Sequence, residues 1–394
     1  MAGIYIHIPF CKQACYYCNF HFSTSLRYKN DFVAALLKEI ELQSAPPSPP
    51  KLSFGVLKPE GVQNSYLHNQ IIETIYFGGG TPSLLSNDEV KIILDKIHEQ
   101  FQVVSNAEIT LEANPDDITD EKLIGWKTSG INRLSIGIQS LFDEDLQWMN
   151  RAHSAAEAKQ VFQKARDAGF ETFTVDLIYG TPGLTDDKWK QNLDWVLQQN
   201  ISHLSCYALT VEEKTPLFKQ INQHQKKDID PEQQSRQFLF LMDYIQQAGF
   251  EHYEISNFAK PGHRSKHNSS YWHGTHYMGL GPSAHSFNGT SRQWNIANNR
   301  QYIQSLQQDL IPFEKEELTA TQQLNEYIMT SLRLMEGCDL QFVHERFGPE
   351  KATQLQQESM LFQQKNWLIE KNDHLLLTRE GKLFADRIAS DLFF

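Results

Sequence analysis

The chain has 394 residues and a formal net charge of -12 at neutral pH, from 48 acidic and 36 basic residues. This negative balance gives no overall basic field to attract nucleic acid or anionic lipid. With 40% hydrophobic residues the chain can bury a sizeable core, and no apolar stretch approaches the ~20 residues of a membrane helix. The length suggests two or three domains, or one large α/β barrel with an extension.

Three cysteines, Cys11, Cys15 and Cys18, are spaced C-x3-C-x2-C directly after an apolar run at 4–8. Thiolates this close repel one another, and a fold keeps such a group when a soft metal centre binds it. Tetrahedral zinc would need a fourth ligand, which His21 could supply. An iron–sulfur cubane normally takes four thiolates, and three would leave one iron open to a small molecule.

The other two cysteines, Cys206 and Cys338, are expected to be small buried hydrophobes. The chain has five cysteines, an odd number, and three of them are clustered, which does not indicate a disulfide framework. The N-terminal residues do not resemble a signal peptide, because charged and cysteine-rich sequence begins within a dozen residues. We therefore expect a reducing, cytoplasmic location.

Strands and helices are predicted to alternate along the first half of the chain. This alternation argues for an α/β fold with a parallel sheet. A proline-rich segment at 44–69 interrupts it and is expected to be a surface loop. The predicted strands are 4–8, 71–77, 107–112, 132–138, 172–178 and 203–208, and the predicted helices are 29–43, 86–101, 120–129, 155–168 and 187–198.

Polar residues follow the predicted strands at their C-terminal ends, where parallel sheets carry their sites. The cysteine loop follows the first strand, and a Gly-Gly-Gly-Thr-Pro segment follows the second. These residues are far apart in sequence, yet we expect them to share one rim. The later strand ends contribute Glu112, Gln139 and Asp176.

These strand ends favour the iron–sulfur cluster over zinc. An open iron can chelate S-adenosylmethionine, and reduction then gives a 5′-deoxyadenosyl radical. That ligand needs a glycine segment for its amino-acid end, carboxylates for its ribose hydroxyls and sulfonium, and an aromatic ring beside adenine. Each candidate alone also has a plain structural explanation, as a turn or a structural carboxylate. The candidates are Gly79, Gly80, Thr81, Glu112, Asp176 and Tyr17.

The chain after residue 208 is less regular. A helix is predicted at 231–248 and a seventh strand at 251–255, followed by a stretch at 258–295 that is rich in glycine, histidine and aromatic residues. His267 and His285 are expected in loops of this stretch without helical spacing, where either could be a haem or metal ligand.

The C-terminal residues predict a small winged-helix-like unit. It has helices at 320–335, 340–347 and 350–364, a hairpin turning at Asn372-Asp373, and a last helix starting near Arg379. Nucleic-acid binding is the usual association of such a unit, but this one is not notably basic. We therefore expect a lid or docking role.

Several motifs occur together in the order of a known family. They are Tyr5-x-His7-x-Pro9-x-Cys11-x3-Cys15-x2-Cys18, then GGGTP, EANP, SIGIQS and VDLIYG. The chain thereby resembles the radical S-adenosylmethionine (radical SAM) proteins of the coproporphyrinogen dehydrogenase (HemN) type over nearly its whole length. The resemblance implies a partial, six-stranded β/α barrel at 1–215, a barrel extension at 216–317 and a helical, winged-helix-like α+β domain at 318–394.

Dehydrogenases of this type carry a further cysteine two residues after the third, and a longer N-terminal extension. Here Phe20 takes that position and only ten residues precede Cys11. With the HNxxYW stretch at 267–272, this is similar to the HemW branch, often labelled coproporphyrinogen III oxidase-like and regarded as haem chaperones. The resemblance implies haem as ligand, and acceptor haemoproteins as partners, including respiratory, membrane-associated ones.

The family motifs also imply the roles of individual residues. Cys11, Cys15 and Cys18 would hold a [4Fe-4S] cluster. Haem would contact the HNxxYW stretch through His267, Tyr271 and Trp272, with His267 as candidate axial ligand and His285 as second choice. S-adenosylmethionine would be surrounded by Tyr5, Tyr17, Gly79, Gly80, Thr81, Glu112, Gln139, Arg151 and Asp176.

Two alternatives to the haem chaperone remain. One is a radical SAM coproporphyrinogen III dehydrogenase, which oxidatively decarboxylates porphyrinogen propionates. The missing fourth cysteine, replaced by Phe20, counts against it. The other is a zinc-stabilised protein without redox chemistry, in which His21 completes the site.

Overall fold

A computed structural model of the chain describes residues 2–44, 67 and 70–394. The proline-rich loop expected at 44–69 therefore lies outside the described residues, apart from Ser44 and Leu67. The domain limits expected near residues 215 and 317 stay a prediction. The chain divides into two compact units: the first comprises Met1–Asp176, Thr210–Lys226 and Thr275–Glu316, and the second Leu177–Leu209, Lys227–Gly274 and Glu317–Phe394.

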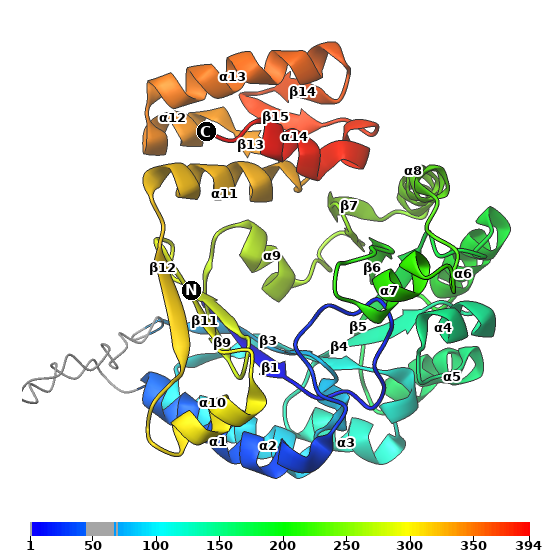
Figure 1. The fold of residues 1–394 in the computed structure, drawn as a ribbon, viewed down its shortest axis with the longest axis vertical. Coiled ribbons are helices and arrows are strands. Elements are labelled where there is room, and N and C mark those ends of the chain that lie inside the picture. The colour runs from blue at the N-terminus through cyan, green and yellow to red at the C-terminus, as the bar shows by residue number, and fades with distance from the viewer. Residues whose placement is uncertain (1, 45–66, 68–69) are drawn as a thin grey trace, which may run out of the picture. The chain divides into compact units, whose positions relative to one another are not determined.

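Alternating strands and helices form the centre of the first unit, as the sequence predicts (Figure 1). Strands β1 to β4 pair in parallel, each with the next, and β5 follows β4 in the sheet. Ile4, Ile6 and Ile8 of β1 are fully buried, which is typical of a strand covered on both faces. The bounds are β1 (Ala2–Ile8), α1 (Lys29–Ser44), β2 (Ile72–Gly79), α2 (Asn87–Gln100), β3 (Val103–Ala113), α3 (Asp120–Thr128), β4 (Arg133–Gln139), α5 (Ala155–Asp167) and β5 (Thr172–Tyr179).

Local sequence signals account for the ends of these helices. At the start of α5, Ser154 accepts a bond from the backbone of Glu157, whose carboxylate bonds back to the backbone of Ser154. Gly130 and Gly169 have φ values of 104° and 83°, left-handed conformations that favour glycine after a helix. The predicted helix stops at these two glycines are therefore confirmed.

A second set of strands in the first unit was not predicted. The stretch at 258–295, for which no strand was predicted from its composition, contains β9, β10 and β11. These strands have three to five residues, too few for a periodic signal. β9 pairs in parallel with β1, and β10 pairs antiparallel with β9 and β11. The additional elements are η1 (Leu26–Tyr28), η2 (Pro82–Leu84), η3 (Pro115–Asp117), α4 (Asp143–Met149), α7 (Pro216–Asn222), β9 (His276–Leu280), β10 (His285–Phe287), β11 (Ser291–Asn295), α10 (Asn299–Leu306) and β12 (Phe313–Glu317).

In the second unit, strands β6, β8 and β7 are neighbours in that order. The predicted seventh strand exists as β7, but it pairs antiparallel with β8, which in turn is antiparallel to β6. The alternation of parallel strands therefore ends at β6. The bounds are α6 (Asp186–Gln198), β6 (His203–Ala208), α8 (Pro231–Gln247), β7 (Glu251–Glu254), β8 (Asn257–Ala259) and α9 (Lys266–Trp272).

The C-terminal part of the second unit has the predicted helices and two-stranded wing. Its core includes Leu324, Ile328 and Leu355. The wing turns at Asn372 and Asp373, whose φ values of 52° and 61° confirm the predicted tight turn. The bounds are α11 (Ala320–Leu332), β13 (Cys338–Asp339), α12 (Leu340–Phe347), α13 (Pro349–Gln364), β14 (Leu368–Lys371), β15 (His374–Leu377), η4 (Gly381–Phe384) and α14 (Ala385–Asp391).

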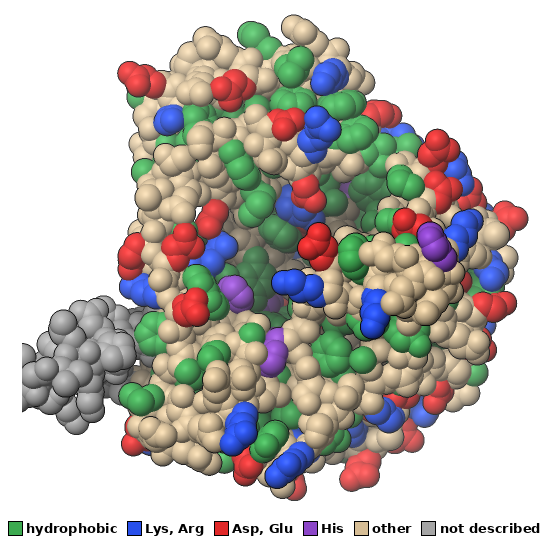
Figure 2. All heavy atoms as spheres, viewed as in Figure 1, with side chains coloured by type: hydrophobic (Ala, Val, Ile, Leu, Met, Phe, Trp, Pro, Cys, Tyr) green, Lys and Arg blue, Asp and Glu red, His purple; other side chains and the backbone are tan. Residues whose placement is uncertain are grey.

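The described surface carries both signs of charge. Figure 2 shows acidic and basic side chains interspersed over the visible face, without a continuous basic area. None of the helices in the described part of the chain has the length and apolarity needed to cross a bilayer. The structure thus agrees with the charge balance read from the sequence.

Candidate functional site

The cysteine loop leaves the C-terminal end of β1 and is closed at its base by backbone hydrogen bonds. The N–H of Cys11 donates to the carbonyl of Ser23 at 3.0 Å, and the N–H of Ser23 donates to the carbonyl of Pro9 at 2.9 Å. Cys11 is buried, whereas Cys15 and Cys18 are partly exposed. The loop therefore holds one thiol inside the unit and presents the other two at its surface.

The thiols are close enough to influence one another. Burial raises the pKa of Cys11 to about 12, and the neighbouring Cys15 and Cys18 add to that rise. Burial also raises the pKa of Cys18. Within the described residues no three His, Cys, Asp or Glu side chains converge as the ligands of one metal ion would. Each thiolate of a cubane binds a different iron, so a cluster does not require such convergence.

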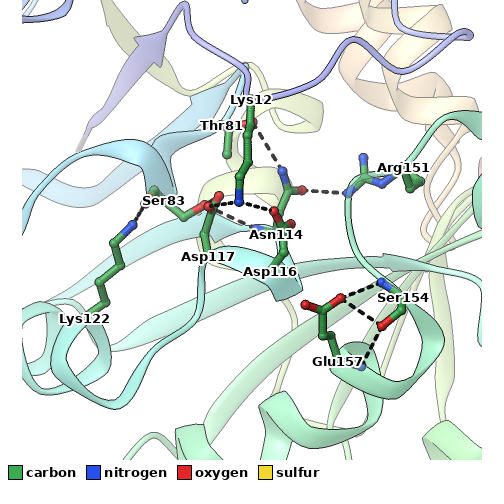
Figure 3. Close-up of polar contacts among 10 residues, drawn as sticks. All are labelled: Lys12, Thr81, Ser83, Asn114, Asp116, Asp117, Lys122, Arg151, Ser154 and Glu157. Atoms are coloured by element: carbon green, nitrogen blue, oxygen red, sulfur yellow. Dashed lines mark hydrogen bonds and ion pairs between the residues drawn. The ribbon is translucent and has the colours of Figure 1, made fainter.

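Arg151, which follows α4, contacts the cysteine loop (Figure 3). Its Nη1 donates to Cys15 Sγ at 3.3 Å and to the Tyr17 hydroxyl at 3.4 Å, and its Nη2 donates to Asn114 Oδ1 at 2.6 Å and to the Gly137 carbonyl at 3.1 Å. Its Nε is buried without a hydrogen-bond partner. A buried donor left over in this way fits an anionic acceptor such as the carboxylate of an amino acid.

The glycine segment at the end of β2 lies against β1 so closely that side chains would not fit. A Cβ on Gly79, whose φ is 102°, would lie 2.6 Å from the ring of His7. A Cβ on Gly80 would lie 2.6 Å from the carbonyl oxygen of Phe10. Close packing against the chain at 7–10 therefore requires glycine in this segment, which we call the glycine cradle.

Two carboxylates from β3 and β5 lie near this cradle. Glu112 accepts a hydrogen bond from the Tyr76 hydroxyl at 2.7 Å, and Asp176 accepts one from the Ser135 hydroxyl at 3.2 Å. Burial raises the pKa of Glu112 to about 7, and the charge of Asp176 adds to the rise. In the register of the sheet Glu112 is opposite Ser135, so the two carboxylates flank β4. Together they offer acceptors for hydroxyl groups and a counter-charge for a cation.

Aromatic and imidazole rings line the β1 side of the site. Tyr5 stacks on Tyr76 with ring centroids 6.2 Å apart, and its hydroxyl lies 3.2 Å from His7 Nδ1. His7 Nε2 bonds to the carbonyl of His21 at 2.8 Å. His21 Nε2 in turn bonds to Asn299 Oδ1 at 2.7 Å. This engagement of His21 does not favour its use as a fourth zinc ligand.

Gln139 ends β4 in a left-handed conformation, with φ of 65°. Such a conformation is uncommon for a residue other than glycine and is often found at functional sites. A Cβ built on Gly137 would lie 2.9 Å from Gln139 Nε2 and 3.3 Å from Arg151 Nη2. The side chains of Gln139 and Arg151 therefore meet over Gly137.

All the residues expected around the cluster and S-adenosylmethionine lie in the first unit. Asn114, Tyr76 and Ser135 belong to the same site but were not predicted. The only signal for Asn114 and Ser135 was their position in the EANP and SIGIQS motifs, and no motif marked Tyr76. The expected residues of this unit are Cys11, Cys15, Cys18, Tyr5, Tyr17, Gly79, Gly80, Thr81, Glu112, Gln139, Arg151 and Asp176.

An ion pair ties the cysteine loop to η3 (Figure 3). Lys12 Nζ lies 2.7 Å from Asp116 Oδ2 and 3.7 Å from Asp117 Oδ1. Asp117 is fixed in turn by the hydroxyl of Ser83, which donates to its Oδ2 at 2.9 Å. Sequence reasoning missed this contact, because the two ends of the ion pair are 104 residues apart.

The haem-contact candidates His267, Tyr271 and Trp272 lie in the second unit, on α9. The expectation of an irregular loop is therefore wrong here; Ser265 caps the helix by accepting a bond from the Asn268 N–H. Helical spacing places His267 and Tyr271 on one face, and His267 Nε2 lies 2.9 Å from the Tyr271 hydroxyl. His267 is fully buried, and burial lowers its pKa to about 3.

The second haem candidate, His285, belongs to the first unit and begins β10. It is exposed, and its ring stacks on Trp294 with centroids 6.1 Å apart. The expectation of a loop is wrong for this residue too, because β10 pairs with β11 at this position. Of the two histidines, only His285 is accessible in this conformation.

Comparison with known proteins agrees with this architecture. Residues 5–196 match the model of the radical SAM superfamily, and residues 318–384 match that of the HemN C-terminal domain. The solved structure of coproporphyrinogen III oxidase (HemN) from Escherichia coli, a radical SAM enzyme, superposes with a TM-score of 0.81 at 22% identity. The match covers 100% of this chain and 90% of that one. At this identity the likeness establishes the fold.

Two curated bacterial relatives match over nearly the full length. "Heme chaperone HemW" of Bacillus subtilis is 31% identical over 392 residues, which cover 98% of each chain. "Heme chaperone HemW" of Escherichia coli is 30% identical over 98% of this chain and 96% of its own. A mouse relative, "Radical S-adenosyl methionine domain-containing protein 1, mitochondrial", is 35% identical over 72% of this chain and 60% of its own. The chain therefore belongs to the HemW family of radical SAM proteins.

Proposed function

We propose that this protein is a haem chaperone, which holds a [4Fe-4S] cluster with S-adenosylmethionine and passes haem to acceptor haemoproteins. The observation that carries the proposal is the match over 98% of both chains to a relative named heme chaperone. The convergence of strand-end residues on the cysteine loop supports the cofactor part. The five cysteines of the chain are all free, which suits a reducing compartment such as the cytoplasm.

Cys11, Cys15 and Cys18 would hold the cluster, which supplies an electron when reduced. The buried Nε of Arg151 and the glycine cradle support a place for the amino-acid end of S-adenosylmethionine. Glu112 and Asp176 would accept hydrogen bonds from its ribose hydroxyls or balance its sulfonium charge. The remaining proposed contacts are Tyr5, Tyr17, Gly79, Gly80, Thr81 and Gln139.

Haem would be taken up at α9 through His267, Tyr271 and Trp272. Since His267 Nε2 is bonded to the Tyr271 hydroxyl, ligation of iron by His267 requires Tyr271 to move. The ring of Trp272 lies under the guanidinium of Arg333, 5.0 Å from its centroid, so a basic group adjoins the proposed contact. His285, accessible in the first unit, is the second candidate for the axial ligand.

The competing function is oxidative decarboxylation of coproporphyrinogen III. It is an alternative because the fold is similar to that of HemN. Phe20 opposes it, because this residue stands where the dehydrogenases carry a further cysteine, and its side chain is 70% exposed. The zinc alternative requires His21 to exchange its hydrogen bond with Asn299 for a metal bond.

The decisive experiment is anaerobic cluster reconstitution followed by haem titration, read from the haem absorption spectrum. The wild type is compared with His267→Ala and Cys18→Ala. A haem chaperone takes up haem in proportion to protein and delivers it to an apo-haemoprotein added afterwards. Reconstituted protein that takes up no haem refutes the proposal. Formation of protoporphyrinogen from coproporphyrinogen III would replace it with the dehydrogenase, and a colourless protein loaded with zinc would replace it with the structural alternative.

A further inference from the structure

Asn114 is the residue on which the polar contacts of the cluster site converge (Figure 3). It directly follows β3, and its N–H donates to the Ser83 hydroxyl at 3.3 Å. Its side-chain Oδ1 accepts from Arg151 Nη2 at 2.6 Å, and its Nδ2 donates to Thr81 Oγ1 at 3.4 Å. The amide thus bridges the glycine segment after β2 and the arginine after α4.

One of these two partners of Asn114 reaches a cysteine. Arg151 Nη1 donates to Cys15 Sγ at 3.3 Å. The other partner, Thr81, fixes the opposite side of the amide. Asn114 is therefore held between the glycine segment and the donor to Cys15.

The chemistry of the bridge requires an amide. Asparagine presents an acceptor on one side and a donor on the other, which suits the guanidinium of Arg151 and the hydroxyl of Thr81 at once. Aspartate would lose the donor, and an apolar side chain would lose both.

Hydrogen bonds to cluster sulfur atoms stabilise the reduced, more negative state and raise the reduction potential. We propose that Asn114 is a positioning residue that sets the reduction potential of the cluster, by aligning Arg151 as a donor to Cys15. This inference rests on the proposed binding of a [4Fe-4S] cluster by the three cysteines. It adds a determinant that does not itself touch the cluster or S-adenosylmethionine.

The test is the midpoint potential of the reconstituted cluster, measured by redox titration with detection by electron paramagnetic resonance. Asn114→Ala is expected to retain its iron and sulfide and to shift the midpoint to a more negative value. Asn132→Ala is the matched control. Its Oδ1 accepts from the Ile109 N–H at 2.9 Å and its Nδ2 donates to the Ala107 carbonyl at 2.7 Å, so it makes a comparable bridge in the same unit. The control should keep the wild-type potential.

A second variant tests whether Asn114 acts through Arg151. Arg151→Lys should shift the midpoint in the same direction, and Asn114→Ala should add no further shift when Arg151→Lys is present. Arg151→Lys also provides the test if Asn114→Ala does not fold. An unshifted midpoint in Asn114→Ala, or in Arg151→Lys where Asn114→Ala does not fold, overturns the inference, as does a full additional shift in the double variant. If the wild type itself assembles no cluster, the proposed function fails first.

Discussion

The hydroxyl of Tyr271 lies 2.9 Å from Nε2 of His267, one helical turn earlier on α9. Nε2 is the atom through which a buried histidine would ligate haem iron. Breaking a neutral hydrogen bond costs about 1 kcal/mol, so Tyr271 imposes a modest barrier to ligation by His267. The pair therefore represents a closed state of the proposed haem site.

Tyr271→Phe should increase the affinity for haem about fivefold, because it removes the hydrogen bond that ligation must break. Haem titration followed by absorption spectroscopy measures the effect. Tyr244→Phe is the matched control in the same unit, since the Tyr244 hydroxyl bonds to Asp194 and not to a histidine. Unchanged or weaker haem binding in Tyr271→Phe would mean that Tyr271 does not restrict His267.

Glu112→Gln should alter how stability depends on pH. Burial raises the pKa of Glu112 from 4.5 to about 7, so the folded state holds its proton more tightly than the unfolded state does. The stabilisation from this group is complete below pH 4.5 and is lost as the pH rises to 7. Urea unfolding measures the free energy of unfolding at pH 5 and pH 7.5. The difference between these two values should be smaller in the variant than in the wild type. Glu99→Gln, at an exposed position, should leave the difference unchanged.

The same titration should affect the proposed binding of S-adenosylmethionine. Above pH 7 the carboxylate of Glu112 is ionised and accepts hydrogen bonds from hydroxyl groups, and below pH 7 it gains a proton. Affinity should therefore fall as the pH is lowered from 8 to 6, and Glu112→Gln should flatten this dependence. Calorimetric titration measures the affinity for S-adenosylmethionine at each pH. If the affinity of the variant depends on pH as steeply as that of the wild type, Glu112 is not the cause of the dependence.

Tyr302→Phe should destabilise the first unit through the fully buried Glu39. The carboxylate accepts from the Tyr302 hydroxyl at 2.5 Å, the Gly281 N–H at 2.8 Å and Asn295 Nδ2 at 2.6 Å. Burial raises the pKa of Glu39 to about 7, so the bond to Tyr302 is charge-assisted above that pH. The free energy of unfolding should fall by about 2 kcal/mol at pH 8 and by less at pH 6.

Chemical denaturation at pH 6 and pH 8 measures how much free energy of unfolding Tyr302→Phe loses at each pH. Tyr244→Phe again serves as control, because the pKa of its partner Asp194 is lowered by the bonds from Lys190 and Tyr244. That carboxylate is ionised at both pH values, so the control should lose the same free energy at each. Equal losses at pH 6 and 8 in Tyr302→Phe would refute the role assigned to Glu39.

Lys12→Ala should loosen the cysteine loop with little effect on global stability. The Lys12 side chain is 54% exposed, and exposed ion pairs contribute about 0–1 kcal/mol. Release from Asp116 should nevertheless speed the loss of a reconstituted cluster to an iron chelator, which the decay of its absorbance reports. Lys91→Ala removes a comparable exposed pair with Asp95 on α2 and should not change that rate. Equal decay in wild type and Lys12→Ala would show that the ion pair does not hold the loop.

Much of the architecture could be predicted because its determinants are local. Apolar runs, glycine stops and the turn at Asn372-Asp373 depend on neighbouring residues, and they are found where expected. The same reasoning failed between 258 and 295, where strands of three to five residues carry too few positions to show a period. His267 was placed in a loop because α9, the helix on which it lies, has only seven residues and shows little helical periodicity in the sequence.

The sequence by itself determined the alternating fold, the family and the three closely spaced thiols, because each depends on residue order and spacing. Only the tertiary structure decided which buried polar groups share hydrogen bonds. Asn114 meets Arg151 across 37 residues and Tyr76 meets Glu112 across 36, through strand register and loop closure. Local sequence does not encode those pairings. They arise because buried donors and acceptors must find partners once the strands are assembled.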